Sequence, residues 1–227
     1  MTLSIDIDFR ADLGAVRSQG RRPTCLAFAS SDAHRHARRH PELLCVEWLF
    51  YHVTQLAGTG PHSGTTIPDT RAVMKSIGQP EECVWPYQAV TPDQTTWHPP
   101  SVKPRLLTCS SDGCEAGLRV VQEEVEDGVP VVIAMFTSTT FTAPASWQRH
   151  GSEIILSRDR GESIDPATGH ALVAVGRGRF RGEPVLLLRN SWGPRWGFDG
   201  HAWVHEDYLA PRLAGAFVIS KEGCDVL

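Results

Sequence analysis

The amino-acid sequence predicts an α+β fold in two lobes. Helical periodicity fills the first half of the chain, whereas short apolar runs typical of strands fill the second half. This segregation favours a helical lobe followed by a lobe built on an antiparallel sheet. The length of 227 residues and the 41% hydrophobic content suit one large domain or two small lobes with a sizeable core.

The first half predicts an extended arm and three helices. Alternating apolar residues near Leu3 favour a short strand, and Thr24 is a good N-cap for the helix that follows. Pro41 ends that helix, and glycines end the next two. Residues 84–104 hold five prolines and read as irregular chain. The expected helices cover residues 25–40, 46–57 and about 66–77.

The second half predicts one helix and a set of strands. The helix covers about residues 114–126, and its acidic run favours an exposed face. The glycine-rich and arginine-rich segment 176–184 is expected to connect two of the strands. The expected strands cover residues 129–136, 171–175, 185–189, 202–204 and 216–220.

Composition excludes several classes of function. The formal net charge is −4 and no long basic run occurs, which argues against a nucleic-acid partner. No apolar run is long enough to span a membrane. The first residues lack the features of a signal peptide, so we expect a cytoplasmic protein whose six cysteines are mostly thiols.

A cysteine stands where the first helix begins. Gly20 and Pro23 mark a turn, and Cys25 follows in the first helical turn. The positive end of the helix dipole and the unpaired N–H groups there both favour a thiolate. Cys25 is therefore a candidate nucleophile, although a lone cysteine among small apolar residues is more often an inert core thiol.

A predicted hairpin in the second half supplies a candidate base. If its turn is centred on Phe180, His170 stands directly opposite Asn190 in the antiparallel pair. Opposed side chains lie about 4.5–5.5 Å apart at Cβ, so the asparagine amide could orient the imidazole. A one-residue slip in register would place the two on opposite faces.

These segments resemble the papain-type cysteine peptidases, in the form of a bacterial-type member without a propeptide. His170 follows Cys25 by 145 residues, an interval typical of this family. Weaker matches are Glu47-Trp48, Gly64 and the run at 85–87. The weak and strong matches together extend over nearly the whole chain. The strong matches are QG at 19–20 with CLAFA at 25–29, GHALVAVG at 169–176 and RNSWGPRWG at 189–197.

The resemblance implies a role for each candidate residue. Cys25 would be the nucleophile, His170 the general base and acid, Asn190 the residue that orients His170, and Gln19 the oxyanion-hole amide acting with the backbone N–H of Cys25. Trp192 resembles the indole that shields the Asn–His hydrogen bond. The residues implied in substrate binding are Ser63, Gly64, Thr65, Gly169 and Trp192.

The resemblance also implies the domain organisation. Residues 1–227 would form a single papain-like catalytic domain with the active-site cleft between its lobes. The helical lobe would cover about residues 12–106. The barrel-like antiparallel lobe would cover about 107–227, with residues 1–11 as a crossing arm.

Two departures from the family pattern stand beside the nucleophile. Arg22-Pro23-Thr24 replaces the family's Cys-Gly-Ser, and Leu26 replaces the usual tryptophan. The disulfide cysteine expected at Arg22 is thus absent, which agrees with a cytoplasmic location. The match begins near residue 9, so we expect no inhibitory propeptide, unless the chain is a processed or excised domain.

The expected function is hydrolysis of peptide bonds in protein or peptide substrates through an acyl-thioester on Cys25. Alternatives are an acyl transferase or ligase, a side-chain amide hydrolase, or a non-enzymatic scaffold that binds a partner through its cleft. A protein partner or inhibitor could regulate the enzyme, and the sequence does not indicate substrate preference.

We expect no cofactor and no metal. The histidines at 34, 36 and 40 favour a solvated helix end that complements the dipole, because no carboxylate or cysteine completes a metal site. Cys109 and Cys114 could form a local disulfide or half of a zinc site, but no second pair stands at suitable spacing.

Overall fold

The computed structural model describes residues 2–114, 117–143, 147–156, 161–220 and 224–226. The chain divides into two compact units. The sheet unit comprises Met1–Arg17 and Gly113–Val218, and the helical unit comprises Ser18–Asp112 and Ile219–Leu227. None of the described helices is both long and apolar enough to cross a membrane.

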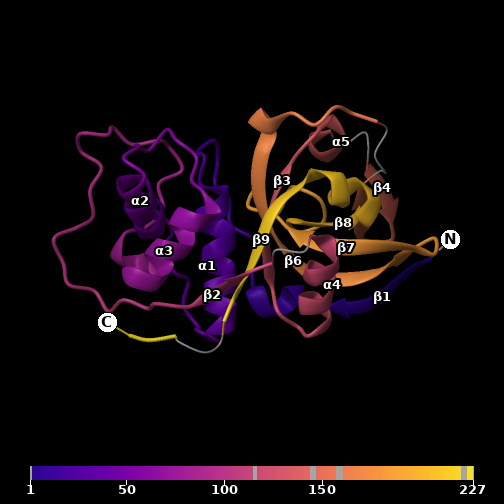
Figure 1. The fold of residues 1–227 in the computed structure, drawn as a ribbon, viewed down its shortest axis with the longest axis horizontal. Coiled ribbons are helices and arrows are strands. Elements are labelled where there is room, and N and C mark those ends of the chain that lie inside the picture. Colours follow the sequence, from indigo (N-terminus) through magenta and orange to yellow (C-terminus); the bar gives the residue numbers. More distant parts are fainter. Residues whose placement is uncertain (1, 115–116, 144–146, 157–160, 221–223, 227) are drawn as a thin grey trace. The chain divides into compact units, whose positions relative to one another are not determined.

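Three α-helices form the helical unit, as the sequence predicts. They are α1 (Cys25–Ala37), α2 (Val46–Leu56) and α3 (Ile67–Ser76), and each packs against the other two (Figure 1). A 3-10 turn (Glu82–Val84) opens the proline-rich segment. Each of the three helices contributes buried apolar side chains, among them Phe28, Leu49, Phe50, Val53 and Met74.

The helix starts differ in how they are capped. Thr66 caps α3, because its hydroxyl oxygen accepts a hydrogen bond from the Asp69 N–H at 3.2 Å. The expectation that Thr24 caps α1 is wrong: the Thr24 side chain makes no cap bond. Its hydroxyl lies 2.8 Å from the Tyr87 hydroxyl instead. The Thr24 side chain therefore accepts no hydrogen bond from the backbone N–H groups at the start of α1.

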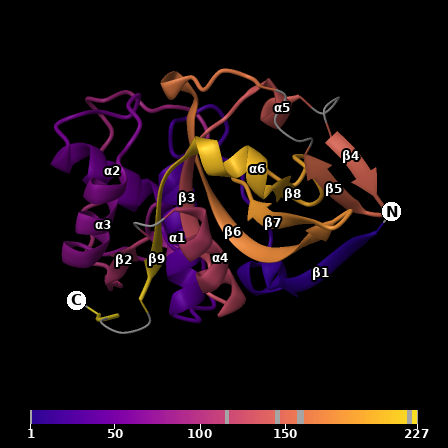
Figure 2. The same cartoon turned by 45° about the vertical axis from the view of Figure 1, so that its right-hand side comes forward.

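The sheet unit is built on one strand path that runs β9-β3-β6-β7-β8-β5-β4, with β1 paired to β6 (Figure 2). The pairing is antiparallel except between β5 and β8, which are parallel, so the expectation of a purely antiparallel lobe is wrong at this edge. Among the described residues no pairing joins β4 back to β9, so the path is open. The strands are β1 (Leu3–Asp8), β2 (Ser111–Gly113), β3 (Val131–Phe136), β4 (Trp147–His150), β5 (Glu153–Leu156), β6 (Gly169–Phe180), β7 (Glu183–Arg189), β8 (His201–His205) and β9 (Leu213–Ile219).

Helices cover this sheet and complete its core. The helix α4 (Leu118–Glu126) packs against β3 and β6 through Val121 and Val125, which are fully buried. Two one-turn helices, α5 (Thr139–Thr142) and α6 (Glu206–Leu209), add Phe141 and Tyr208 to the same apolar cluster. The charged positions of α4 remain at the surface, which is the amphipathic arrangement expected of a helix that covers a sheet.

The hairpin between β6 and β7 is longer than the sequence predicts. The segment 176–184 is not a connecting loop, because β6 continues through it to Phe180. The turn consists of Arg181 and Gly182, whose φ angles are 56° and 84°. Two successive positive φ angles are typical of the tight turns that join antiparallel strands. Consequently Phe180 pairs with Glu183 instead of standing at the centre of the turn.

The register of this hairpin corrects the predicted pairing of His170. A bulge lies between Ala174 and Gly176. On the His170 side of this bulge, Val173 pairs with Arg189. His170 is therefore not directly opposite Asn190, as the centred turn would require. Continuing the observed register places His170 two residues from the position opposite Asn190. An offset of two keeps both side chains on the same face of the sheet, within diagonal reach.

Glycines let β1 approach β6. A Cβ atom added at Gly178 would lie 2.3 Å from the Ser4 carbonyl oxygen. We expect Gly178→Ala to lower the free energy of unfolding by about 1–3 kcal/mol, because backbone must move to admit the methyl group. Urea denaturation measures the change. The control is Gly169→Ala in the same strand, where an added Cβ meets nothing within 4 Å; equal denaturation midpoints for the two variants would contradict the prediction.

Candidate active site

The predicted site residues divide between the two units. His170, Asn190, Trp192 and Gly169 belong to the sheet unit. Cys25, Gln19 and the segment 63–65 belong to the helical unit. The residues of each unit are therefore described separately.

His170 and Asn190 are joined by a short hydrogen bond. His170 is the second residue of β6 and pairs with Met135 of β3, and Asn190 directly follows β7. The distance from His170 Nε2 to Asn190 Oδ1 is 2.7 Å. Both side chains are buried, with exposed fractions of 8% and 3%. The structure therefore brings together the two residues that the sequence placed in one hairpin.

The hydrogen bonds of Asn190 settle the tautomer of His170. The Ser191 N–H reaches the same Asn190 oxygen at 2.7 Å, and an N–H can only donate, so this atom accepts both bonds. His170 Nε2 must then carry a proton, which leaves Nδ1 of the neutral ring with a lone pair. The Asn190 Nδ2 group is buried and has no hydrogen-bond partner among the described residues.

Aromatic rings surround this imidazole. The Trp192 ring centroid lies 4.6 Å from that of His170, with 34° between the ring planes. Phe141 contacts both Trp192 and His170, at centroid distances of 5.7 and 6.3 Å. The indole of Trp192 therefore packs against the imidazole, and its role as a shield stays a prediction.

Burial shifts the protonation equilibrium of His170. Desolvation lowers the pKa of His170 to about 4, and the hydrogen bond to Asn190 opposes that change only in part. By itself the imidazole is therefore neutral at pH 7 and able to accept a proton. A His170 cation at neutral pH requires a negative charge close to the ring to raise its pKa.

Cys25 is the first residue of α1, as predicted, and its side chain is partly exposed. The first turn of α1 contains no acidic residue and the Thr24 side chain does not cap it. The partial positive charge at this helix end is thus not offset by a carboxylate of the first turn or by a side-chain cap.

Gln19 is buried in the loop before α1. Its Nε2 group donates a hydrogen bond to the Arg22 carbonyl oxygen at 2.8 Å. A primary amide carries two N–H groups, so this bond fixes the amide and uses one of them.

The proposed substrate segment has accessible backbone. Gly64 is exposed, and a Cβ atom added there would meet nothing within 4 Å. Ser63 is held by the bond from its N–H to the Gly60 carbonyl at 3.0 Å, and Thr65 is partly exposed. In the sheet unit, Gly169 is exposed at the start of β6. Backbone is therefore accessible at both places.

Sequence reasoning missed a buried ion pair beside Gln19. Arg22, at the position where the resemblance expects a disulfide cysteine, binds Glu47 of α2, and neither side chain has exposed surface. A lone carboxylate within an apolar helical run was the available signal, because a buried carboxylate needs a cationic partner. All six cysteines are thiols, so Cys109 and Cys114 are not joined in a disulfide.

One histidine of α1 also differs from expectation. His34 is fully buried and its Nδ1 lies 3.0 Å from Gln79 Oε1, so it is not part of a solvated helix end. Burial lowers the pKa of His34 to about 4. His34 is therefore a neutral core residue, and its role is structural.

Comparison with known proteins identifies the family. The family model described as "Papain family cysteine protease" matches residues 3–210. The chain belongs to the papain family of cysteine proteases. Among curated papain relatives, the rice oryzain gamma chain is 26% identical over 201 residues, which cover 86% of this chain and 53% of that protein. Bovine pro-cathepsin H is 50% identical over 64 residues, 28% of this chain and 19% of that protein. The chain thus matches about half of one relative and a smaller part of the other.

Solved structures confirm the papain-like α+β fold. Xylellain, a cysteine protease from Xylella fastidiosa, aligns with a TM-score of 0.73 and 21% identity, covering 96% of this chain and 87% of that chain. Digestive procathepsin L 3 of Tenebrio molitor aligns with a TM-score of 0.71 and 17% identity, covering 97% and 71%. At these identities the likeness is one of fold.

Proposed function

We propose that this papain-family protein is a cysteine peptidase that hydrolyses peptide bonds of protein or peptide substrates. The observation that carries the proposal is the buried hydrogen bond between His170 Nε2 and Asn190 Oδ1, which leaves Nδ1 with the lone pair that a general base needs. A partly exposed thiol at the start of α1 supports Cys25 as the nucleophile.

The proposed reaction proceeds through a covalent intermediate. His170 Nδ1 takes the proton of the Cys25 thiol, and the sulfur attacks the scissile carbonyl carbon. The oxyanion accepts hydrogen bonds from the Gln19 amide and the Cys25 backbone N–H. His170 returns the proton to the leaving amine as the C–N bond breaks, and an acyl-thioester remains. Water then attacks the thioester with His170 as base, which releases the carboxylic acid and the thiol.

We assign the remaining predicted residues to substrate and architecture. The backbone of residues 63–65 would pair with extended peptide, and Gly169 and Trp192 would contact it from the sheet unit. Residues 1–227 would act as one catalytic domain with lobes at about 12–106 and 107–227, and residues 1–11 as an arm. A protein partner or inhibitor acting on the site would regulate it.

We also propose that the protein works in the cytoplasm. The support is Arg22, which forms a buried ion pair at a position where the resemblance implies a disulfide cysteine. Fractionation of the source cells with an antibody to the protein tests this location, and recovery only outside the cytoplasm would contradict it.

Covalent labelling tests the nucleophile. We expect an epoxide-type thiol inhibitor to form one adduct, located at Cys25 by peptide mass spectrometry. Cys25→Ala should remove the adduct, whereas Cys83→Ala should keep it, although Cys83 is an exposed thiol. A folded, reduced wild-type protein without an adduct at Cys25 would refute the proposal.

The pH dependence of alkylation tests the pairing of Cys25 with His170. A thiolate raises the pKa of a nearby imidazole, so the pair should exist as thiolate and imidazolium below neutral pH. We expect the rate of Cys25 alkylation by iodoacetamide to stay high below pH 7. In His170→Gln the rate should instead rise with pH through the ordinary thiol range, near 8.5. Identical profiles for the two proteins would show that His170 does not act on Cys25.

Product analysis separates the remaining activities. Hydrolysis of a peptide panel gives products with free carboxyl groups, whereas a transferase or ligase gives amide products when an amine acceptor is added. Hydrolysis of side-chain amides leaves the peptide length unchanged. A binding scaffold would give no product, and its biological activity would survive Cys25→Ala.

A further inference from the structure

Arg22 is held in one position inside the helical unit. Its Nη1 and Nη2 groups donate to the two Glu47 oxygens at 2.6 and 2.8 Å, and both side chains have 0% exposed surface. A two-pronged contact of this kind fixes the plane as well as the position of the guanidinium. The ion pair therefore links the loop before Cys25 to the first turn of α2.

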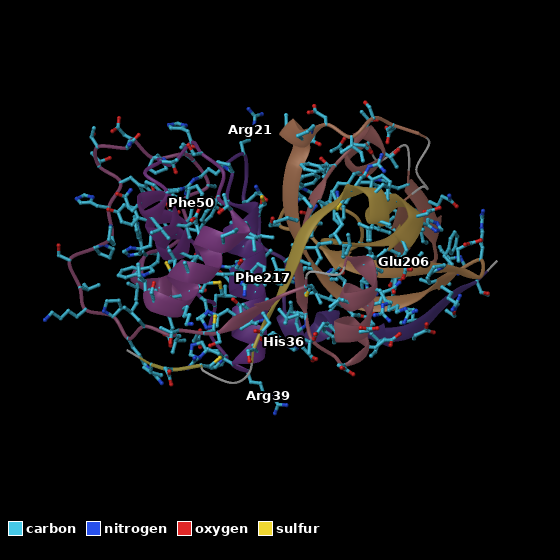
Figure 3. The ribbon with its side chains drawn as sticks, viewed as in Figure 1. Arg21, His36, Arg39, Phe50, Glu206 and Phe217 are labelled. Carbon is cyan, nitrogen blue, oxygen red and sulfur yellow. The ribbon has the colours of Figure 1, made fainter. Side chains whose placement is uncertain are left out.

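Neighbouring groups bind both members of the pair, although the buried Arg22 Nε–H has no hydrogen-bond partner among the described residues. Arg22 Nη1 also donates to the Gln88 carbonyl at 2.6 Å, while Glu47 accepts from the Gln88 N–H at 3.2 Å and from Trp97 Nε1 at 2.6 Å. Figure 3 labels Phe50 within the helical unit. Three rings face the guanidinium carbon, with their centroids at 5.4 Å for Phe50, 5.0 Å for Tyr87 and 5.9 Å for Trp97.

The same cluster holds the loop on its other side. The Tyr87 hydroxyl lies 2.8 Å from the Gln19 carbonyl oxygen and 2.8 Å from Thr24 Oγ1. A carbonyl only accepts, so Tyr87 donates to Gln19 and receives the hydrogen of Thr24. Both ends of the loop 19–24 are thus tied to the segment that carries Tyr87 and Gln88.

We propose that Arg22 is a positioning residue for the Gln19 amide. The Arg22 carbonyl accepts one N–H of Gln19 at 2.8 Å, so the place of that carbonyl sets the direction of the second N–H. The buried side chain of Arg22, held by Glu47, fixes the carbonyl in turn. This inference rests on the proposed function, in which the Gln19 amide stabilises the oxyanion.

The mechanism predicts a selective kinetic effect. The oxyanion exists only during bond making and breaking, so a displaced Gln19 amide weakens binding of the transition state and leaves binding of the substrate unchanged. Loss of the Arg22 anchor should therefore lower kcat with little change in KM. Alkylation of Cys25 by iodoacetamide forms no oxyanion and should keep its rate.

The experiment is a kinetic cycle between Arg22 and Gln19. The substrate is the fluorogenic peptide amide that the wild-type protein cleaves fastest. We expect Gln19→Ala to lower kcat about 10²–10³-fold. Arg22→Met should lower kcat about tenfold or more with KM within about twofold. In the Gln19→Ala background, Arg22→Met should change kcat by less than about twofold, because the two substitutions remove the same interaction.

The neighbouring arginine provides a matched control. Arg21 is exposed, and Figure 3 shows it pointing outward from the ribbon. Arg21→Met removes the same charge from the same loop and should leave kcat within about twofold of wild type. If Arg22→Met does not fold, Arg22→Met/Glu47→Leu removes both charges without leaving a buried ion unpaired, and it should show the same loss of kcat.

Other outcomes would contradict the inference. Losses of kcat that multiply between Arg22→Met and Gln19→Ala would show that Arg22 does not act through Gln19. A folded Arg22→Met/Glu47→Leu variant with wild-type kcat would also overturn the inference. A wild-type protein that hydrolyses no peptide overturns the proposed function together with this inference, whereas a hydrolysing wild type with an unaffected Arg22→Met variant overturns the inference alone.

Discussion

His170→Ala is expected to lower kcat/KM for peptide hydrolysis by about 10⁴-fold or more, because the variant loses both the base that activates Cys25 and the acid that protonates the leaving amine. Steady-state hydrolysis of a fluorogenic peptide measures the effect. Circular dichroism and urea denaturation confirm that the variant is folded.

Two further variants serve as comparisons for His170→Ala. His98→Ala removes an exposed histidine of the helical unit and should retain wild-type kcat/KM. Asn190→Ala leaves the imidazole in place without its 2.7 Å partner, so its loss should lie between those of the other two variants. Comparable activity of His170→Ala and His98→Ala would refute the assignment of His170.

Glu47→Leu is expected to lower the free energy of unfolding by about 3–5 kcal/mol, because it leaves the Arg22 cation buried without a counter-ion. The substitution also removes the acceptor of the Trp97 indole N–H. Urea denaturation followed by fluorescence measures the loss. Arg22→Met/Glu47→Leu should recover most of the stability, because well-packed apolar groups replace a buried ion pair at little cost.

An exposed ion pair serves as the control for this prediction. Arg119 and Glu123 lie one turn apart on α4 with 79% and 54% of their side chains exposed. Glu123→Gln should change the free energy of unfolding by less than about 0.5 kcal/mol. If Glu47→Leu and Glu123→Gln behave alike, burial does not control the energetics of the Arg22–Glu47 pair.

Local signals account for the parts of the fold that the sequence predicts well. The three helices follow from apolar spacing and from stops such as Pro41, and the cap at Thr66 forms as its residue type suggests. The register of the β6–β7 hairpin failed, because a bulge after Ala174 and the turn at Arg181 depend on contacts with other strands. The parallel pairing of β5 with β8 was missed for the same reason, since β8 lies far along the chain from β5.

The contact between His170 and Asn190 was predicted because motif and spacing coincide there. The surroundings of His34 and Arg22 depend instead on tertiary contacts. His34 looks solvated beside other cationic residues, yet the packing of α1 buries it against Gln79. Arg22 looked like a missing cysteine, and only the fold brings Glu47 to it from 25 residues away. Residues that contact each other from distant positions leave no periodic pattern in the sequence. A single sequence therefore shows that a residue is unusual at its position, but it does not show which residue it contacts.

The hydrogen bonds of Asn190 have a consequence for the electrical character of the site. Its oxygen accepts two N–H groups, while its amide nitrogen donates to no group among the described residues. An aspartate of the same shape could therefore replace it without losing a hydrogen bond. Such a carboxylate would place a full negative charge 2.7 Å from the imidazole and raise its pKa. The amide thus orients the ring without adding a charge, and in the proposed mechanism it leaves the His170 cation acidic enough to give its proton to the departing amine.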